Sequence, residues 1–225
     1  MEFSRYAVYF TPPAGSALHA FGASVLGWDP VGGVRVPHLD APGVDIAAIT
    51  DTPRKYGFHA TIKPPFRLAQ GCTAEDLWEA FEALAGRHAP VTLPGLALAR
   101  LGRFLALVPV GQTADLSALA SRAVTELDRF RAPATEAELS RRRAARLSRA
   151  QEDNLVKWGY PYVLDEFRFH MTLSGRLDDP GPVLEALRPR VQALNLSPFT
   201  IGSLTLMGEA RDGMFREVSR VALAG

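Results

Sequence analysis

The stretch Phe58-His59-Ala60-Thr61-Ile62 recurs later in the chain as Phe169-His170-Met171-Thr172-Leu173. Each copy has an aromatic residue before a His, a Thr two residues after that His, and an aliphatic residue last. Successive side chains of a β-strand point to opposite faces. If both copies are strands, their apolar side chains enter a core, and each His shares the other face with its Thr. The repeat therefore predicts two matching strands that present two imidazoles and two hydroxyls.

Length and composition describe an ordinary globular protein. The 225 residues include 47% hydrophobic and 22% charged residues, enough for a substantial core. The net charge of +1 does not favour a non-specific binder of nucleic acid or membrane. A single cysteine, Cys72, excludes an intramolecular disulfide and a Cys-based zinc cluster, and fits a reducing compartment. With no signal-peptide pattern and no apolar run of ~20 residues, the sequence predicts a cytoplasmic protein that does not engage a membrane.

Strand and helix patterns alternate along the chain. Strands are expected near residues 5–11, 57–68, 91–100, 104–110, 196–206 and 215–223, and helices near 16–26, 73–87, 113–130, 135–149 and from 179 onward. Residues 27–53 are predicted to be a long irregular loop, either a lid or a packed surface excursion. The mixed order favours an α+β class. We expect one domain over residues 1–225, built of two pseudo-symmetric lobes that carry the motifs at 58–62 and 169–173.

Two histidines across a cleft suit general acid–base chemistry, because an unperturbed imidazole has a pKa of about 6.5. One neutral ring would take a proton from water while the other, as imidazolium, protonates a leaving oxygen. Thr61 and Thr172 would hold the non-bridging oxygens of a phosphodiester. Lys63 continues the polar face of the first copy, and Ser174 stands at the equivalent place in the second. The scheme needs no metal or cofactor, and the near symmetry of the copies leaves the acid and base unassigned.

Other chemistries have weaker support in the sequence. A mononuclear metal site could use His59 and His170 with His38 or a carboxylate, but no His-x-x-x-His pair or carboxylate lies at ligand spacing beside either motif. No Gly-x-Ser-x-Gly elbow marks a serine nucleophile, and Cys72 is interpreted as a packed side chain. A binding protein that holds a nucleotide or phosphosugar without turnover remains the alternative from another functional class.

An arginine-rich helix and an aromatic segment provide candidate substrate contacts. Arg142 and Arg146 would share one helical face with Arg149 and could bind a terminal phosphate or an RNA backbone, although a solvated face is the preferred interpretation. Tyr160 and Tyr162 could stack on a base or sugar, or form a rigid corner between the lobes. RNA 2′,3′-cyclic phosphate end processing is therefore a third hypothesis, with RNA a less favoured partner than a small phosphorylated molecule.

Paired His-x-Thr strands resemble the 2H phosphoesterase superfamily, which is named for its two His motifs. The resemblance implies a bilobal α+β fold in which two antiparallel sheets face each other across a central cleft, with helices outside. It also implies catalytic roles for His59 and His170 and phosphate-holding roles for Thr61 and Thr172.

A closer resemblance covers almost the whole chain. The segments that carry it are Arg5-Tyr-Ala-Val-Tyr9, Tyr56-Gly-Phe-His-Ala-Thr-Ile-Lys-Pro-Pro-Phe66, Phe130-Arg-Ala-Pro133, Trp158-Gly-Tyr-Pro-Tyr-Val163 and Phe167-Arg-Phe-His-Met-Thr-Leu173. They are similar to a bacterial family of unknown function whose genes lie in phosphonate-utilisation operons. Such operons produce a phosphorylated ribose that carries a 1,2-cyclic phosphate. The resemblance implies metal-independent hydrolysis of a small cyclic phosphodiester, and Lys63, Arg142 or Arg146 would suit a second phosphate. It indicates no oligomeric state.

Overall fold

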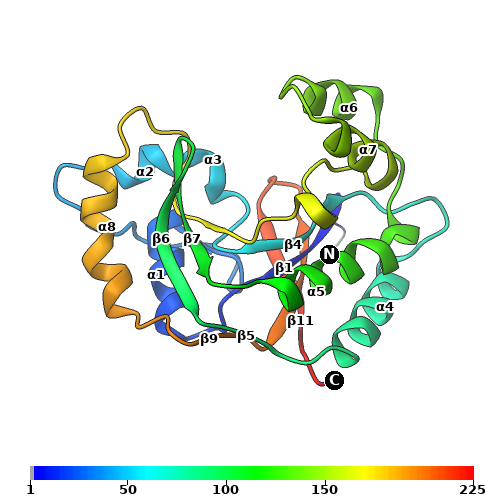
Figure 1. Ribbon diagram of the computed structural model, residues 1–225, viewed down its shortest axis with the longest axis horizontal. Helices are drawn as coiled ribbons and strands as arrows, with labels where there is room; N and C mark the ends of the chain where they lie inside the picture. Colours follow the sequence, from blue (N-terminus) through cyan, green and yellow to red (C-terminus); the bar gives the residue numbers. More distant parts are fainter. Residues whose placement is uncertain (1–2) are drawn as a thin grey trace.

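The computed structural model describes residues 3–225, and most of its strands join one antiparallel sheet (Figure 1). The seven strands lie in the order β11-β10-β1-β4-β8-β7-β6. Their bounds are β1 Arg5–Phe10, β4 Ala60–Phe66, β6 Gly95–Leu101, β7 Phe104–Val110, β8 Met171–Thr172, β10 Ser203–Glu209 and β11 Phe215–Ala222. Two small pairs stand apart: β2 Trp28–Asp29 with β3 Val34–Arg35, and β5 Val91–Leu93 with β9 Phe199–Ile201. The predicted α+β class is confirmed.

The sheet has two halves that meet at the repeated motifs. Strands β11, β10, β1 and β4 form one half, and β8, β7 and β6 form the other. Where β4 meets β8, Ala60 pairs with Met171, the middle residue of each motif. The lobes expected to carry separate facing sheets are therefore two parts of one sheet. The junction is narrow, because β8 has only two residues and meets β4 at this one pair.

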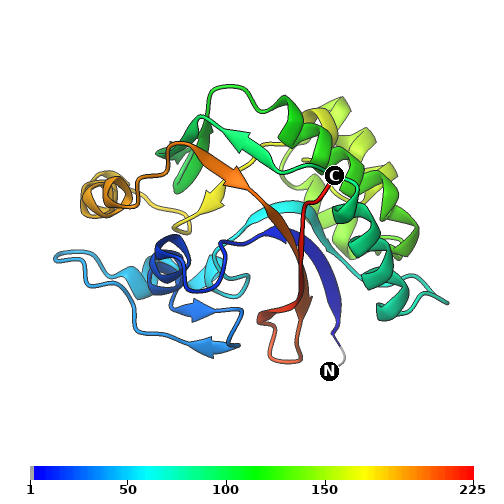
Figure 2. The ribbon, with the colours of Figure 1, turned by 90° about the horizontal axis from the view of Figure 1, so that it is seen from below.

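The helices around the sheet form two groups, one at the left and one at the right of Figure 2. One group comprises α1 Ala17–Leu26, α2 Ile46–Ile49, α3 Asp51–Arg54 and α8 Gly181–Ala193; the other contains α4 Ala74–Gly86 and α5 Ala114–Glu126. Two short 3₁₀ turns, Asp128–Phe130 and Leu164–Glu166, complete the connections. Side-chain caps begin α1 at Ser16 and α4 at Thr73, which agrees with the helices expected near 16–26 and 73–87. Within residues 3–225, no helix has the length and apolarity needed to cross a membrane.

Strand β1 separates the main core from the functional face. Tyr6, Val8 and Phe10 pack into the large apolar cluster beneath the helices, whereas Ala7 and Tyr9 belong to a smaller cluster with Met207 and Phe215. This division follows from the alternation of side chains along a strand. The face that carries Tyr9 is therefore the one on which a site can form.

The arginine-rich segment is two helices, so the expectation of one helix over 135–149 is wrong. Helix α6 spans Glu136–Arg143, and α7 spans Arg149–Trp158. Arg146 adopts a left-handed conformation with φ 54°, and the hydroxyl of Ser148 caps α7 by accepting from the Gln151 N–H. Arg142, Arg146 and Arg149 therefore do not share a helical face. The α6–α7 hairpin, residues 136–158, projects from the body at the upper right of Figure 1.

Residues 27–53 are not irregular throughout, which corrects the expected long loop. They contain the β2–β3 pair, α2 and the start of α3. Neighbouring elements hold them in place: the Arg54 guanidinium donates to the Ala47 carbonyl, and Arg190 donates to the Asp40 carbonyl. The segment ends at Thr52 and Pro53, which line the cavity described below.

Candidate functional site

His59 precedes β4 by one residue and is held by the turn before it. Gly57 has φ 71°, a left-handed conformation that favours glycine. Its carbonyl oxygen lies 2.8 Å from His59 Nδ1. A carbonyl only accepts hydrogen bonds, so Nδ1 carries the proton and Nε2 holds the lone pair. The Thr61 hydroxyl, 3.2 Å from Nε2, therefore donates to it.

His170 repeats this arrangement one residue before β8. Its Nδ1 lies 2.8 Å from the carbonyl oxygen of Arg168, again two residues upstream. The same reasoning places a proton on Nδ1 of His170. The ring packs at a tilt against Phe104, with centroids 5.8 Å apart. Each motif therefore uses its own backbone to orient an imidazole through Nδ1, which leaves Nε2 directed away from the backbone contact.

Tyr9 makes the two histidines unequal. Its ring stacks on His59 at 3.8 Å between centroids and 20° between planes. Burial lowers the pKa of His59 to about 4; the Gly57 carbonyl opposes this shift, and the nearby positive charge of His170 adds to it. His59 is therefore a neutral proton acceptor across the physiological range.

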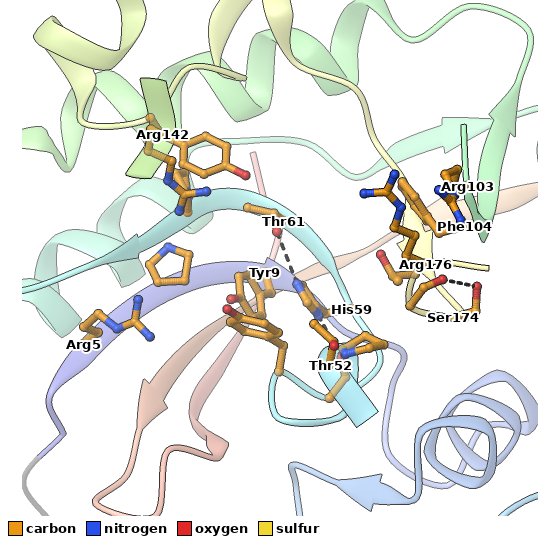
Figure 3. A pocket seen from close by; sticks show the side chains of 18 residues that line it. Arg5, Tyr9, Thr52, His59, Thr61, Arg103, Phe104, Arg142, Ser174 and Arg176 are labelled. Atoms are coloured by element: carbon orange, nitrogen blue, oxygen red, sulfur yellow. Dashed lines mark hydrogen bonds between the residues drawn. The ribbon is translucent and has the colours of Figure 1, made fainter. Parts of the chain in front are cut away.

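A cavity of about 550 Å³ opens over these side chains (Figure 3). His59, Thr61, Thr172 and Ser174 line it, and His170 lies just outside the lining, against the lining residue Phe104. The basic side chains on its wall are Arg5, Arg103, Arg142 and Arg176, and among residues 3–225 no Asp or Glu lines it. Four guanidiniums without a lining carboxylate favour an anionic ligand.

Lys63 does not reach this cavity, which corrects the expectation that it binds phosphate. Its side chain is only 2% exposed, and its Nζ donates to the Val124 carbonyl at 3.0 Å and lies 3.6 Å from Asp128 Oδ1. The cause is a bulge: Thr61 lies opposite Tyr9 and Lys63 opposite Val8, so two residues of β4 match one of β1. Lys63 thereby turns to the core face.

We expect Lys63→Met to retain activity and to remove a pH dependence of stability. Burial lowers the pKa of Lys63 from 10.5 to about 8. Between these values the unfolded chain holds the proton and the folded chain does not, so the native protein becomes more stable as pH rises, by about 2 to 3 kcal/mol. Chemical denaturation at pH 7.5 to 10.5 measures this rise. An equal rise in Lys63→Met, or loss of turnover in that variant at pH 7.5, would contradict the assignment.

The other sequence candidates divide between the cavity wall and the surface. Ser174 lines the cavity but is 1% exposed, and its Oγ donates to the Gly175 carbonyl and accepts from the Leu105 N–H. Its hydroxyl is thus engaged in the fold. Arg142 and Tyr160 line the cavity, whereas Arg146 and Tyr162 are exposed and do not.

Several lining residues were not predicted from the sequence: Arg5, Tyr9, Thr52, Tyr56, Arg103, Phe104 and Arg176. Two had a usable signal. Arg176 continues the alternating face of His170, Thr172 and Ser174, and Tyr9 lies on the opposite face of β1 from its core residues. The other arginines approach from β1 and the β6–β7 turn, so only the fold brings them to the cavity.

Metal ligation is not evident in the described part of the chain. Within residues 3–225, no group of three or more His, Cys, Asp or Glu side chains is placed to hold a metal ion. Cys72, partly buried, packs against the main core.

Two curated relatives are similar to this chain, and both are named ribose 1,5-bisphosphate phosphokinase PhnN. The protein of Janthinobacterium sp. (strain Marseille) is 36% identical over 234 residues, which cover 100% of this chain and 52% of the relative. The protein of Laribacter hongkongensis (strain HLHK9) is 37% identical over 184 residues, which cover 78% of this chain and 41% of the relative. The chain therefore spans about half the length of the curated relatives it matches.

Solved structures with partial similarity include LigT of E. coli complexed with 3′-AMP, with 15% identity, full coverage of both chains and a TM-score of 0.45. TT0787 of Thermus thermophilus has 16% identity, 98% coverage of each chain and a TM-score of 0.43.

The model of one protein family matches residues 61–216, from Thr61 of the first motif through the whole of the second. That segment is well over half of the chain, and the match agrees with the resemblance seen in the sequence. The chain belongs to the family described as protein of unknown function (DUF1045).

Proposed function

We propose that this protein is a 2H-type phosphoesterase that hydrolyses a small cyclic phosphodiester. The observation that carries the proposal is the matched pair of histidines, each oriented by a carbonyl two residues upstream and joined at the Ala60–Met171 pair. The arginine-lined cavity beside them supports an anionic substrate. Both features come from residues far apart in the sequence.

The reaction follows from the two imidazoles. His59, kept neutral, takes a proton from water as the water oxygen bonds to phosphorus. One ring P–O bond breaks, and protonated His170 gives its proton to the departing oxygen. The products are a phosphomonoester and a free hydroxyl, and proton exchange with solvent restores both histidines. With substrate bound, the Thr61 hydroxyl turns from His59 Nε2 to a non-bridging oxygen, and Thr61 and Thr172 donate to these oxygens as charge develops on them.

The names of the relatives support a particular substrate, ribose 1,2-cyclic phosphate with a phosphate at O5. Breaking its O2–P bond yields ribose 1,5-bisphosphate, the compound in the relatives' printed name. A segment similar to this chain occupies about half of those longer proteins. A hydrolase joined to a kinase that takes its product would perform consecutive steps, which supports a role for this reaction in phosphonate catabolism.

Kinase activity in this chain is less well supported than hydrolysis. A P-loop kinase needs Gly-x-x-x-x-Gly-Lys-Ser/Thr to hold the nucleotide phosphates. The chain has three lysines, Lys55, Lys63 and Lys157, and none follows a glycine. The kinase name is therefore better explained by the part of the relatives that this chain does not match.

The direct test incubates the purified protein with 5-phosphoribosyl 1,2-cyclic phosphate in EDTA and follows the products by ³¹P NMR. Formation of ribose 1,5-bisphosphate supports the proposal. Binding without product would favour a non-catalytic phosphosugar-binding protein. Turnover confined to RNA ends that carry a 2′,3′-cyclic phosphate would favour RNA processing.

The pH profile tests the role of His59 separately. A general base works only when deprotonated, and the pKa of His59 is lowered to about 4. We expect the acidic limb of the kcat/KM profile, where the general base becomes protonated, to be centred near pH 4. An acidic limb centred near 6.5, the value for an unperturbed imidazole, would contradict this assignment.

A further inference from the structure

The cavity continues beneath the α6–α7 hairpin into a second, strongly basic depression. Arg5, Pro65, Arg142 and Tyr160 line both spaces. The continuation adds Arg67, Arg131 and Arg141, and in the described part of the chain Glu138 is the one carboxylate that lines it. This end of the site therefore carries a local excess of positive charge, although the net charge of the whole chain is only +1.

Carboxylates compensate some of these arginines but not Arg142. Arg5 pairs with Glu209, Arg67 with Glu138, and Arg131 with Asp128. Within residues 3–225, Arg142 has no carboxylate within ion-pair distance. Its guanidinium is half-buried and lies 4.5 Å from the centre of the Tyr160 ring. It is held in place and retains its charge for a ligand.

The opposite end of the cavity is less suited to binding an anion. Figure 3 shows Arg5 and Arg142 on one side of His59 and Thr61, and Arg103 and Arg176 on the other. Arg103 already donates to the Leu177 carbonyl and the Asp178 carboxylate, and Arg176 is exposed. A guanidinium held over an aromatic ring loses less conformational entropy on binding than an exposed one.

We propose that Arg142 binds a phosphomonoester at the end of the substrate remote from the cyclic phosphate. The inference rests on the proposed function and assigns the part of the site that selects the substrate. A guanidinium presents paired N–H donors that match phosphate oxygens. Because Arg142 already covers one face of Tyr160, the pair offers donors and charge rather than an open platform for a nucleobase.

The hairpin allows this contact to be tested without unfolding the protein. Helix α6 has no buried residue, and α7 buries only Leu155. Replacing Arg142 therefore removes no core contact. Arg146 lies on the same hairpin, carries the same charge and lines neither space, so Arg146→Gln is a matched control.

The experiment compares kcat/KM for ribose 1,2-cyclic phosphate with and without the 5-phosphate. We expect the wild type to prefer the phosphorylated substrate by about 10- to 100-fold, the range for charge-assisted hydrogen bonds. Arg142→Gln should lose most of this preference, and Arg142→Lys should keep part of it as a point charge. Arg146→Gln should behave as the wild type with both substrates.

Three results would overturn the proposal: a wild type without preference, an equal loss on both substrates in Arg142→Gln, or the same loss in Arg146→Gln. If no cyclic substrate is turned over, the proposed function fails, and calorimetry with ribose 5-phosphate still tests the subsite. Binding that weakens at least about tenfold in Arg142→Gln but not in Arg146→Gln supports it. Equal binding by all three proteins refutes it.

Discussion

Replacing either His59 or His170 by alanine is expected to lower turnover of the cyclic substrate by about 10² to 10⁴-fold, the usual contribution of a positioned acid or base. One variant loses the group that accepts the proton from water, and the other loses the group that protonates the leaving oxygen. Each imidazole is oriented for its role by its own carbonyl contact. The double variant should lose little more than the worse single one, since the pair acts as a unit. Initial rates by ³¹P NMR provide the measurement.

The control for these variants is His88→Ala. His88 lies just beyond α4, its Nδ1 contacts the Leu84 carbonyl, and it does not line the cavity. We expect full activity from this variant and melting temperatures near wild type for both catalytic variants. If either catalytic variant kept wild-type activity, the two-histidine mechanism would be wrong.

The second large effect is expected at Gly22, in the middle of α1. A Cβ built at this position would lie 2.6 Å from Cβ of Phe58 and 1.9 Å from its Cδ1. Phe58 is buried and immediately precedes His59, so Gly22→Val must push the residue that anchors the first motif. We expect a loss of about 3 kcal/mol in the free energy of unfolding, and a melting temperature about 6 to 12 °C lower.

Ala20→Val tests whether this effect comes from the contact or from helix propensity. Ala20 is exposed on the same helix, so its substitution costs only the lower helix propensity of valine, about 0.5 kcal/mol. Below the melting transition, Gly22→Val should also lose activity as His59 shifts, and Ala20→Val should not. Comparable melting temperatures for the two variants would contradict the packing argument.

Local patterns predicted most elements of this fold. Apolar periodicity located α1, α4 and α5, and the alternation in β1 matches the division between its core and cavity faces. These features depend on neighbours in the chain. The left-handed Arg146 and the Ser148 cap divide the arginine-rich segment into two helices, whereas the sequence predicts one helix over 135–149.

By itself the sequence determined the repeated motif, and with it the two His-x-Thr pairs and the apolar faces that bury each motif. Only the tertiary structure decided which neighbours join them. A bulge in β4 turns Lys63 into the core, and Tyr9 stacks on one histidine but not the other. The arginines converge from β1, the β6–β7 turn, the chain after β8 and α6. The face to which each side chain of a strand points follows from its neighbours in the chain and can be predicted from the sequence. The pairing register of β4 with β1, and the meeting of the arginines at the cavity, depend on contacts between segments distant in sequence.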